Sequence, residues 1–278
     1  KYQYMVTDYP GTIGLRFNFI NGGTSGLMSN VKIRKAISYS IDREEMIDAV
    51  YGRYNPAYSY VAPAITFNGS SYRDQVGEIM EDEYNEYVGD PDKIVALFQE
   101  GLDELGVETP IEDITLTYLT SGSTTEVQAE REYIQQSLEE TLGLTVELSV
   151  AGDTSLFIAD RNEGNYDFFL GGWYSDYNDP LDFLYTNYTD AYGMSFGGYS
   201  NTDYDALADQ LVGETDMDKR LDIYKQMEQI LLLDDCAFAP IYYATKQVLL
   251  QNWVKDYRTS SFGASAEFIW TYIDGKNQ

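Results

Sequence analysis

Histidine is absent from this chain of 278 residues, and cysteine occurs once, as Cys236. The lack of imidazole excludes Ser-His-Asp and Cys-His catalysis and any histidine-built metal site. A single thiol excludes an internal disulfide and a cysteine-built zinc site. Because Cys236 lies just before the apolar stretch Phe238–Tyr243, we expect a buried spectator rather than a reactive thiol.

Long apolar runs are also missing. No stretch approaches the roughly 18 residues that a membrane-spanning helix needs, and the first residues lack the apolar segment of a signal peptide. We therefore expect neither feature in this sequence. Hydrophobic residues still make up 44% of the chain, which is enough for a core in one large domain or two modest ones.

Basic residues are few, since 18 Lys and Arg stand against 46 Asp and Glu, for a net charge of −28. Such a field repels a phosphate backbone, so nucleic acid is not expected as a partner. It favours solubility and weakly favours cationic ligands. Tyrosine is abundant, with 26 residues, and it suits surfaces that bind polar, extended ligands.

Motifs for common enzyme chemistry are missing as well. Gly11–Gly14 and Gly22–Gly26 match neither nucleotide-binding fingerprint, and the sequence contains no G-x-S-x-G. Paired carboxylates could serve a glycosidase, but among 46 acidic residues such pairs arise by chance. We predict no catalytic residue, no metal and no cofactor, and a carboxylate-dependent hydrolase is the least favoured alternative.

The patterning predicts an α/β fold. Ile114–Leu119, a helix over 124–142 and Leu144–Val150 form a strand-helix-strand unit, with a right-handed crossover if the strands are parallel. Asp90 is expected to cap a helix that ends at Gly106. Residues 52–75 are rich in Gly, Pro, Asn and Ser and predict an extended surface segment. Further predicted helices follow Asn30 and Asp42 and cover 155–161, 203–211 and 218–233, and further predicted strands cover 13–20, 166–170, 238–243, 247–250 and 267–273.

The ten residues 171–180, GGWYSDYNDP, are the most informative stretch. They follow the apolar run Tyr166–Leu170, which predicts a buried strand. The glycine pair lets another backbone come close, Trp173 offers a rigid apolar face, and the carboxylate of Asp176 can meet a cation. The stretch could therefore grip an extended ligand with a positive charge, such as the amino end of a peptide. A strand, a turn and a helix N-cap would use the same residue types.

Calcium is a weaker alternative for Asp176, Asn178 and Asp182. The spacing fails the EF-hand loop, because Pro180 stands where an oxygen ligand would be and no glutamate closes the site. Asn178 and Asp179 are expected to serve as turn and cap.

Three segments carry a resemblance to a known family. Residues 30–50, NVKIRKAISYSIDREEMIDAV, are similar to the pattern x-V-R-x-A-[IL]-x-x-A-I-D-R, and residues 166–184 to D-x-x-x-x-G-W-x-x-D-Y-x-D-P-x-x-[FL]-L. Residues 236–243 are similar to the return strand x-x-P-[IL]-[FY]-x. These patterns resemble those of the extracytoplasmic solute-binding proteins of peptide ABC importers, the oligopeptide/dipeptide-binding family 5.

The resemblance implies a two-lobed clamp of periplasmic-binding-protein-like fold. Residues 30–235 would form the inserted ligand-binding lobe, with a mixed sheet and flanking helices. Residues 1–29 and 236–278 would be strips of the terminal lobe, and the N-terminal half of the clamp would be missing.

The resemblance also assigns roles to residues. Asp176 matches the aspartate that pairs with a peptide's α-amino group, and the stretch before it matches the strand whose backbone meets the peptide. Arg161 falls where some members carry an arginine near the peptide's carboxylate, whereas Leu170 stands where others have another arginine. Arg34 and Arg43 are expected to be structural. The predicted ligand-binding residues are Gly171, Gly172, Trp173, Tyr174, Asp176 and Arg161.

The function implied is the substrate-binding component of an ABC importer, present here as a C-terminal fragment and not an enzyme. It would capture extracellular oligopeptides and deliver them to permease subunits in the membrane. Its location would be extracytoplasmic, as a Gram-positive cell-surface lipoprotein or in a periplasm. The alternative is a non-peptide solute, an oligosaccharide or a metal chelate, on the same scaffold.

Overall fold

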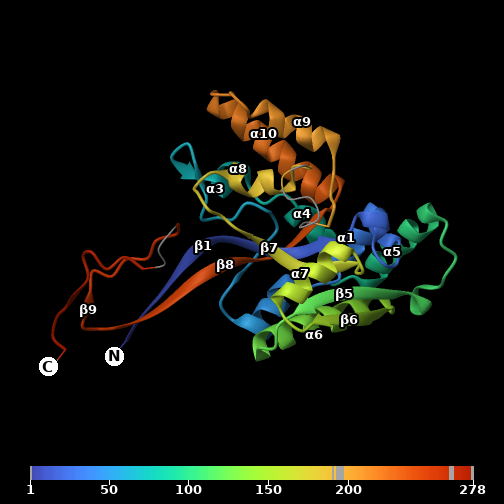
Figure 1. Cartoon of the computed structure of the whole chain (residues 1–278), viewed down its shortest axis with the longest axis horizontal. Helices are drawn as coiled ribbons and strands as arrows, with labels where there is room; N and C mark the ends of the chain where they lie inside the picture. The colour runs from blue at the N-terminus through green and yellow to red at the C-terminus, as the bar shows by residue number, and fades with distance from the viewer. Residues whose placement is uncertain (1, 190, 192–196, 263–265, 277–278) are drawn as a thin grey trace.

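A single mixed sheet runs through the molecule in the strand order β2-β8-β1-β7-β5-β6 (Figure 1). The computed structural model describes residues 2–189, 191, 197–262 and 266–276. β1 is antiparallel to β7 and β8, whereas β5 is parallel to β6 and β7. The predicted α/β architecture with a mixed sheet is therefore confirmed. The sheet strands are β1 (Tyr2–Phe17), β2 (Asn55–Pro56), β5 (Thr115–Ser121), β6 (Thr145–Ala151), β7 (Phe168–Tyr174) and β8 (Phe238–Gln251).

Helices surround this sheet, and two short strand pairs lie outside it. The α-helices are α1 (Val31–Tyr39), α2 (Arg43–Met46), α3 (Tyr72–Val76), α4 (Glu81–Tyr87), α5 (Pro91–Leu105), α6 (Thr125–Leu142), α7 (Thr154–Glu163), α8 (Pro180–Leu184), α9 (Thr202–Gln210) and α10 (Met217–Gln229). The π-helical turns are η3 (Ile47–Tyr51) and η7 (Ile230–Asp234), and the 3-10 turns are η1 (Ile20–Gly22), η2 (Leu27–Ser29), η4 (Ile111–Asp113) and η5 (Tyr185–Asn187). The short strands are β3 (Thr66–Phe67), β4 (Ser70–Ser71), β9 (Val254–Lys255) and β10 (Tyr272–Ile273).

Local capping signals fix the helix ends where the sequence predicts them. The Asn30 side chain accepts hydrogen bonds from the first turn of α1, and Asp90 does the same for α5. α5 ends at Gly106, which adopts a left-handed φ of 68°. The predicted strand-helix-strand unit is confirmed as β5-α6-β6, and its two strands are parallel.

β1 and β8 are the longest strands, and they extend beyond the body of the sheet as a two-stranded ribbon (Figure 1). The two strands predicted at 238–243 and 247–250 are one continuous strand, and the strand predicted at 13–20 starts far earlier and ends at Phe17. The lobe boundaries predicted at 29/30 and 235/236 would place β1 and β8 in one lobe and β5–β7 in the other. All of these strands belong to one sheet, so the sheet is not divided at those boundaries. The division into lobes stays a prediction.

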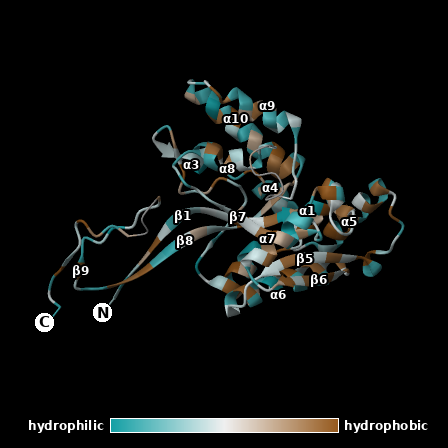
Figure 2. Ribbon diagram, viewed as in Figure 1, coloured by the Kyte–Doolittle hydropathy of each residue, from teal (hydrophilic) through white to brown (hydrophobic). Residues whose placement is uncertain are grey.

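Two apolar clusters pack on opposite faces of this sheet. One gathers side chains from α1, α5 and α6, and the other gathers side chains from α8, α9 and α10. The neighbouring residues Phe238 and Ala239 of β8 belong to different clusters, as expected for alternating sides of a strand. Figure 2 shows hydrophobic and hydrophilic segments alternating along β5 and β6, and both kinds on α9 and α10.

The expectation of an exposed segment at 52–75 is wrong. Tyr60, Val61, Ile65 and Tyr72 are all fully buried there. The predicted strand at 267–273 is also largely wrong, since Glu267 makes a single bridge to Arg258 and the paired strand is only Tyr272–Ile273. At 52–75 tertiary packing overrides local propensity. At 267–273, by contrast, Phe268, Ile269 and Trp270 are exposed rather than packed in a sheet.

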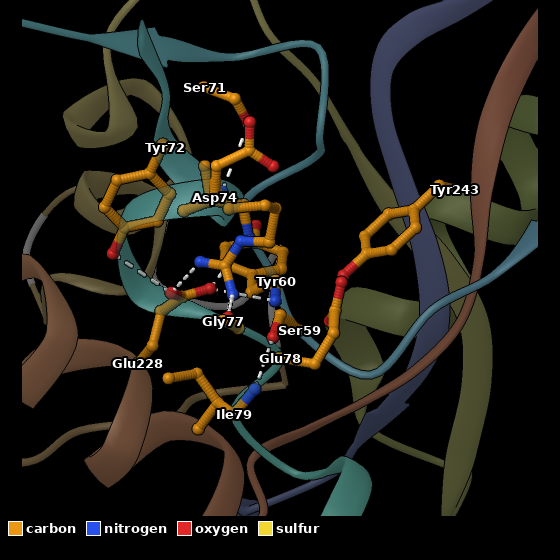
Figure 3. A network of polar contacts seen from close by, with 12 residues as sticks. Ser59, Tyr60, Ser71, Tyr72, Asp74, Gly77, Glu78, Ile79, Glu228 and Tyr243 are labelled. Atoms are coloured by element: carbon orange, nitrogen blue, oxygen red, sulfur yellow. Dashed lines mark hydrogen bonds and ion pairs between the residues drawn. The ribbon is translucent and has the colours of Figure 1, made fainter.

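A buried carboxylate explains why the 52–75 segment lies inside. Glu228 of α10 is 0% exposed and accepts backbone hydrogen bonds from Tyr60 at 3.0 Å and Val61 at 2.9 Å. It also accepts from the Tyr72 hydroxyl at 3.0 Å (Figure 3). In addition it forms an ion pair with Arg73. A buried charge persists where donors surround it, so the segment folds around this one side chain.

We expect Glu228→Gln to lower the free energy of unfolding by about 3 kcal/mol, because the change leaves the Arg73 guanidinium buried without its counter-charge. Urea denaturation measures this loss. The matched control is Glu86→Gln in the exposed pair with Lys93, which should stay within roughly 0.5 kcal/mol of the parent. A loss below about 1 kcal/mol for Glu228→Gln would show that the ion pair does not anchor the segment.

Candidate ligand-binding site

β7 has an open edge. It pairs with β1 along its whole length, from Phe168 opposite Phe17 to Tyr174 opposite Gly11. On its other side, β5 pairs with Phe168 and Phe169 alone. In the part of the chain that the structure describes, no strand continues that side from Leu170 to Tyr174. An unpaired strand edge is a template for an added strand.

One of the two glycines of this strand, Gly172, is required by the pairing with β1. A Cβ on Gly172 would lie 1.9 Å from the carbonyl oxygen of Thr12, so a side chain there would separate the strands. A Cβ on Gly171 would lie 2.7 Å from the Phe169 ring. The close backbone that Gly172 admits is therefore that of β1, and contact of either glycine with a ligand stays a prediction.

Asp182 organises the turn that follows β7. Its carboxylate is 7% exposed and accepts hydrogen bonds from the indole of Trp173 at 3.0 Å, the hydroxyl of Ser175 at 2.7 Å and the backbone of Asp176 at 2.8 Å. Sequence reasoning considered Asp182 only for calcium and missed this positioning role. The sequence signal for this role is the position of Asp182 in the first turn of α8, from which its side chain can reach back to the end of β7.

Asp176 itself turns outward at the end of the open edge. Its side chain is exposed, and among the described residues no cation forms an ion pair with it. Its backbone is fixed by Asp182, and the neighbouring Ser175 donates its backbone N–H to the carbonyl of Pro10 at 2.7 Å. The carboxylate is thus accessible, while the turn that carries it is held in place.

The other polar residues of the turn are structural, as expected. Asp179 caps α8 through the backbone N–H of Leu181 at 2.8 Å. Asn178 exchanges two hydrogen bonds with Thr66, at 2.8 Å and 2.6 Å. The oxygens considered for calcium therefore point to different partners. Among the described residues, no group of three or more Cys, Asp or Glu side chains could hold a metal ion.

Arg161 of α7 lies over the opposite end of the open edge. Its guanidinium carbon is 5.9 Å from the ring centre of Phe169 and 6.0 Å from that of Phe157. Its Nε is buried without a hydrogen-bond partner, and no described carboxylate forms an ion pair with it. Burial lowers the pKa of Arg161. A half-buried cation in this state is a ready partner for an anion.

Arg34 and Arg43 are fully engaged inside the fold. Arg34 donates to the carbonyl of Asp235 at 3.0 Å, and Arg43 donates to the carbonyl of Pro240 at 2.7 Å. Their predicted structural role is confirmed. Cys236 is 0% exposed, and burial raises the pKa of its thiol to about 11, so the predicted spectator is confirmed too.

Tyr174 borders a pocket of about 450 Å³ on the face of the sheet opposite Trp173. The pocket is lined by Tyr9, Tyr54, Tyr174, Ala244, Thr245 and Lys246.

A half-buried glutamate lies near these tyrosines. Glu130 of α6 accepts a hydrogen bond from the Tyr51 hydroxyl, and burial raises the pKa of Glu130 to about 7. Burial raises the pKa of Tyr174 and of Tyr242, and the charge of Glu130 contributes to both shifts. Arg53 forms an ion pair with Glu126, which lies one helical turn before Glu130 on α6.

The mixed sheet and its flanking helices have a periplasmic-binding-protein-like fold. The chain belongs to the bacterial extracellular solute-binding proteins, family 5, whose middle-region model matches residues 1–195. Dipeptide-binding protein DppE of Bacillus subtilis (strain 168) is 30% identical over 249 residues, which cover 89% of this chain and 42% of DppE. The chain thus spans about two fifths of that relative's length.

Solved structures agree on the fold. The substrate-binding domain of an oligopeptide ABC transporter from Bacillus anthracis str. Ames matches with a TM-score of 0.80 and 24% identity, over 97% of this chain and 51% of that one. Listeria monocytogenes OppA bound to peptide matches with a TM-score of 0.76 and 30% identity, over 97% and 50%. Across the described residues, no helix combines the length and apolar character needed to cross a membrane.

Glu130 gives a pH-dependent prediction. Its pKa of about 7 in the fold lies above the ordinary value of 4.5, so the folded state favours the protonated form, and stability is lost as the pH rises from 4.5 through 7. Glu130→Gln removes this cost, so the variant should gain roughly 2 kcal/mol relative to the parent between pH 5 and pH 8.

Urea denaturation at both pH values measures the difference. Glu132→Gln, an exposed position on the same helix, is the control and should leave the pH profile unchanged. If the two variants behave alike, the Glu130 carboxylate does not titrate near neutrality.

Proposed function

We propose that this chain is the peptide-contacting part of the substrate-binding component of an ABC importer. The component captures extracellular oligopeptides and delivers them to the membrane permease. The observation that carries this proposal is the open edge of β7, which ends at a fixed turn with an accessible carboxylate, Asp176. Family members are solute-binding proteins, and the similar proteins include a dipeptide-binding protein and an OppA bound to peptide.

Binding in this proposal needs no covalent chemistry. A peptide lies along Leu170–Tyr174 as an added strand. Its backbone forms the inter-strand hydrogen bonds that β5 does not form with this part of β7. Its ammonium pairs with Asp176, and a second lobe closes over it by hinge motion. An oligosaccharide or a metal chelate has no peptide backbone to continue a strand ladder, so the open edge favours a peptide over these alternatives.

The far end of the peptide meets Arg161. From Phe169, beneath Arg161, to Tyr174 the strand makes a span of about 17 Å at roughly 3.3 Å per residue. An extended peptide of about five residues therefore covers the strand from Tyr174 to the end that lies beneath Arg161. The carboxylate of a longer peptide would lie beyond Arg161 and would not pair with its guanidinium.

We place the component outside the cytoplasmic membrane, as a cell-surface lipoprotein or in a periplasm, with the permease subunits as its partners. The lobe boundaries at 29/30 and 235/236 are modified in this proposal. The inner halves of β1 and β8 belong to the ligand-binding lobe, because they form the centre of its sheet. The crossing between lobes then falls at residues 9–11, where the pairing of β1 with β8 is interrupted between Asp8 and Thr12.

Asp176→Asn tests the amino end. In the native-length protein, calorimetry should show affinity for free-amine peptides falling about tenfold or more, because a charge-assisted pair is lost. Affinity for the same peptides with an N-acetyl group should not change. Asp222→Asn, an exposed carboxylate on α10, is the control. Equal losses for free and acetylated peptides would contradict the assignment.

Arg161→Gln tests the carboxyl end. Five-residue peptides with a free carboxylate should lose about tenfold in affinity, because the guanidinium no longer pairs with it. Peptides with a C-terminal amide should bind parent and variant alike. Lys225→Gln, an exposed cation on α10, is the control. An equal loss of affinity for free and amidated peptides would show that Arg161 is not part of the binding site.

A further inference from the structure

The β3-β4 hairpin turns on the dipeptide Asn68-Gly69. Its two short strands pair residue by residue, so only these two residues connect them. Both have a positive φ, 48° at Asn68 and 87° at Gly69. This is the pattern of a type I′ turn, which the dipeptide Asn-Gly favours.

An Asn-Gly dipeptide can react with itself. The backbone nitrogen of the glycine attacks the side-chain carbonyl carbon of the asparagine and forms a C–N bond, while the side-chain nitrogen takes up the glycine proton and leaves as ammonia. Water then opens the five-membered succinimide at either of its two carbonyl carbons. The products are aspartate and isoaspartate, and no oxidant, enzyme or cofactor takes part. Glycine favours the attack because it has no Cβ to obstruct the ring.

The reacting atoms of the hairpin lie in the open. Asn68, Gly69 and Ser70 are all exposed, and a Cβ on Gly69 would find no atom within 4 Å. In the part of the chain that the structure describes, neither the Asn68 side-chain amide nor the Gly69 N–H makes a hydrogen bond. The side chain is therefore free to turn toward the glycine nitrogen, and water reaches the ring that forms.

The opening that ring closure needs is small. Asn68 must rotate out of its turn conformation so that the glycine nitrogen faces its side-chain carbonyl. β3 and β4 contain two residues each, and so short a hairpin opens at little cost in free energy. Gly69 has the backbone freedom to follow this rotation.

The second Asn-Gly of the sequence offers a comparison within the same chain. Asn21 is exposed with a φ of 54°, but Gly22 is buried in η1. The Gly22 N–H donates weakly to the carbonyl of Phe19 at 3.5 Å, and a Cβ on Gly22 would lie 3.1 Å from the backbone nitrogen of Ser29. The glycine nitrogen of this pair is enclosed, so the same chemistry needs a larger opening.

The hairpin also braces the turn that carries Asp176. The Thr66 backbone N–H donates to the side chain of Asn178 at 2.8 Å, and the Asn178 amide donates to the Thr66 hydroxyl at 2.6 Å. Phe67 anchors the hairpin, because it is 6% exposed and its ring meets that of Tyr224 edge to face at 5.4 Å. A change of the backbone after Phe67 therefore acts directly beside the contacts that hold the turn.

We propose that Asn68 is a site of spontaneous deamidation and that isoaspartate at this position releases Thr66 from Asn178. Isoaspartate carries the main chain through its side-chain carbon, which adds one methylene to the backbone. The two-residue loop then no longer closes a type I′ turn, and the strand register that positions Thr66 is lost. The modification goes beyond the proposed peptide binding and does not depend on it.

Ageing of the native-length protein in mildly alkaline buffer made with oxygen-18 water tests the modification. Peptide mapping by mass spectrometry should show Asn68 deamidating about tenfold faster than Asn21, because the enclosed Gly22 must first be exposed. The Asn68 product should carry one labelled oxygen and include isoaspartate, which electron-transfer fragmentation distinguishes from aspartate. Equal rates at the two sites, or aspartate without isoaspartate, would overturn the proposal.

Asn68→Gly is the matched variant, because Gly-Gly also suits a type I′ turn but has no side chain to react. Hydrogen exchange should show the Thr66 amide losing about tenfold in protection in the aged parent and none in aged Asn68→Gly. Asn21→Gly is the control and should age as the parent does. If the Thr66 amide keeps its protection in molecules that carry isoaspartate, the hairpin is not released and the proposal fails.

Discussion

The double pairing of β1 is the constraint on which the rest of the structure depends. β1 hydrogen-bonds to β8 on one side and to β7 on the other, and so joins segments more than 200 residues apart. The approach is close enough to require glycine, since a Cβ on Gly14 would lie 2.2 Å from the carbonyl oxygen of Ala239. β7 is thereby pinned on one side while its other side stays open, and the two apolar clusters form on the faces of the sheet.

Order at the candidate site comes from residues that need not touch a ligand. Asp182 collects three donors and sets the turn, while Asn178 ties that turn to the β3-β4 pair. The carbonyl of Pro10 accepts a hydrogen bond from Ser175, so the turn is also joined to β1. The turn that carries the exposed carboxylate of Asp176 is consequently held by three separate parts of the chain, which is the pre-organisation that binding sites require.

Much of the fold follows from local signals. The caps at Asn30 and Asp90 and the stop at Gly106 depend on neighbours within one helical turn, so the sequence predicts them well. The burial of residues 52–75 was not predictable in this way, because the side chain that draws them inward, Glu228, lies more than 150 residues away. The site behaves likewise: the strand and turn follow from local pattern, whereas the open edge depends on how far β5 runs beside β7.

The thiol of Cys236 has a practical consequence. It is sealed in the core next to the carbonyl that Arg34 binds, and its φ of 42° fixes it in a conformation that few side chains tolerate. Maleimide reagents attack exposed thiolates, so the native chain presents no competing target at neutral pH. A cysteine introduced on the turn or on α7 would therefore carry a fluorophore or spin label at one defined position without removal of the native residue.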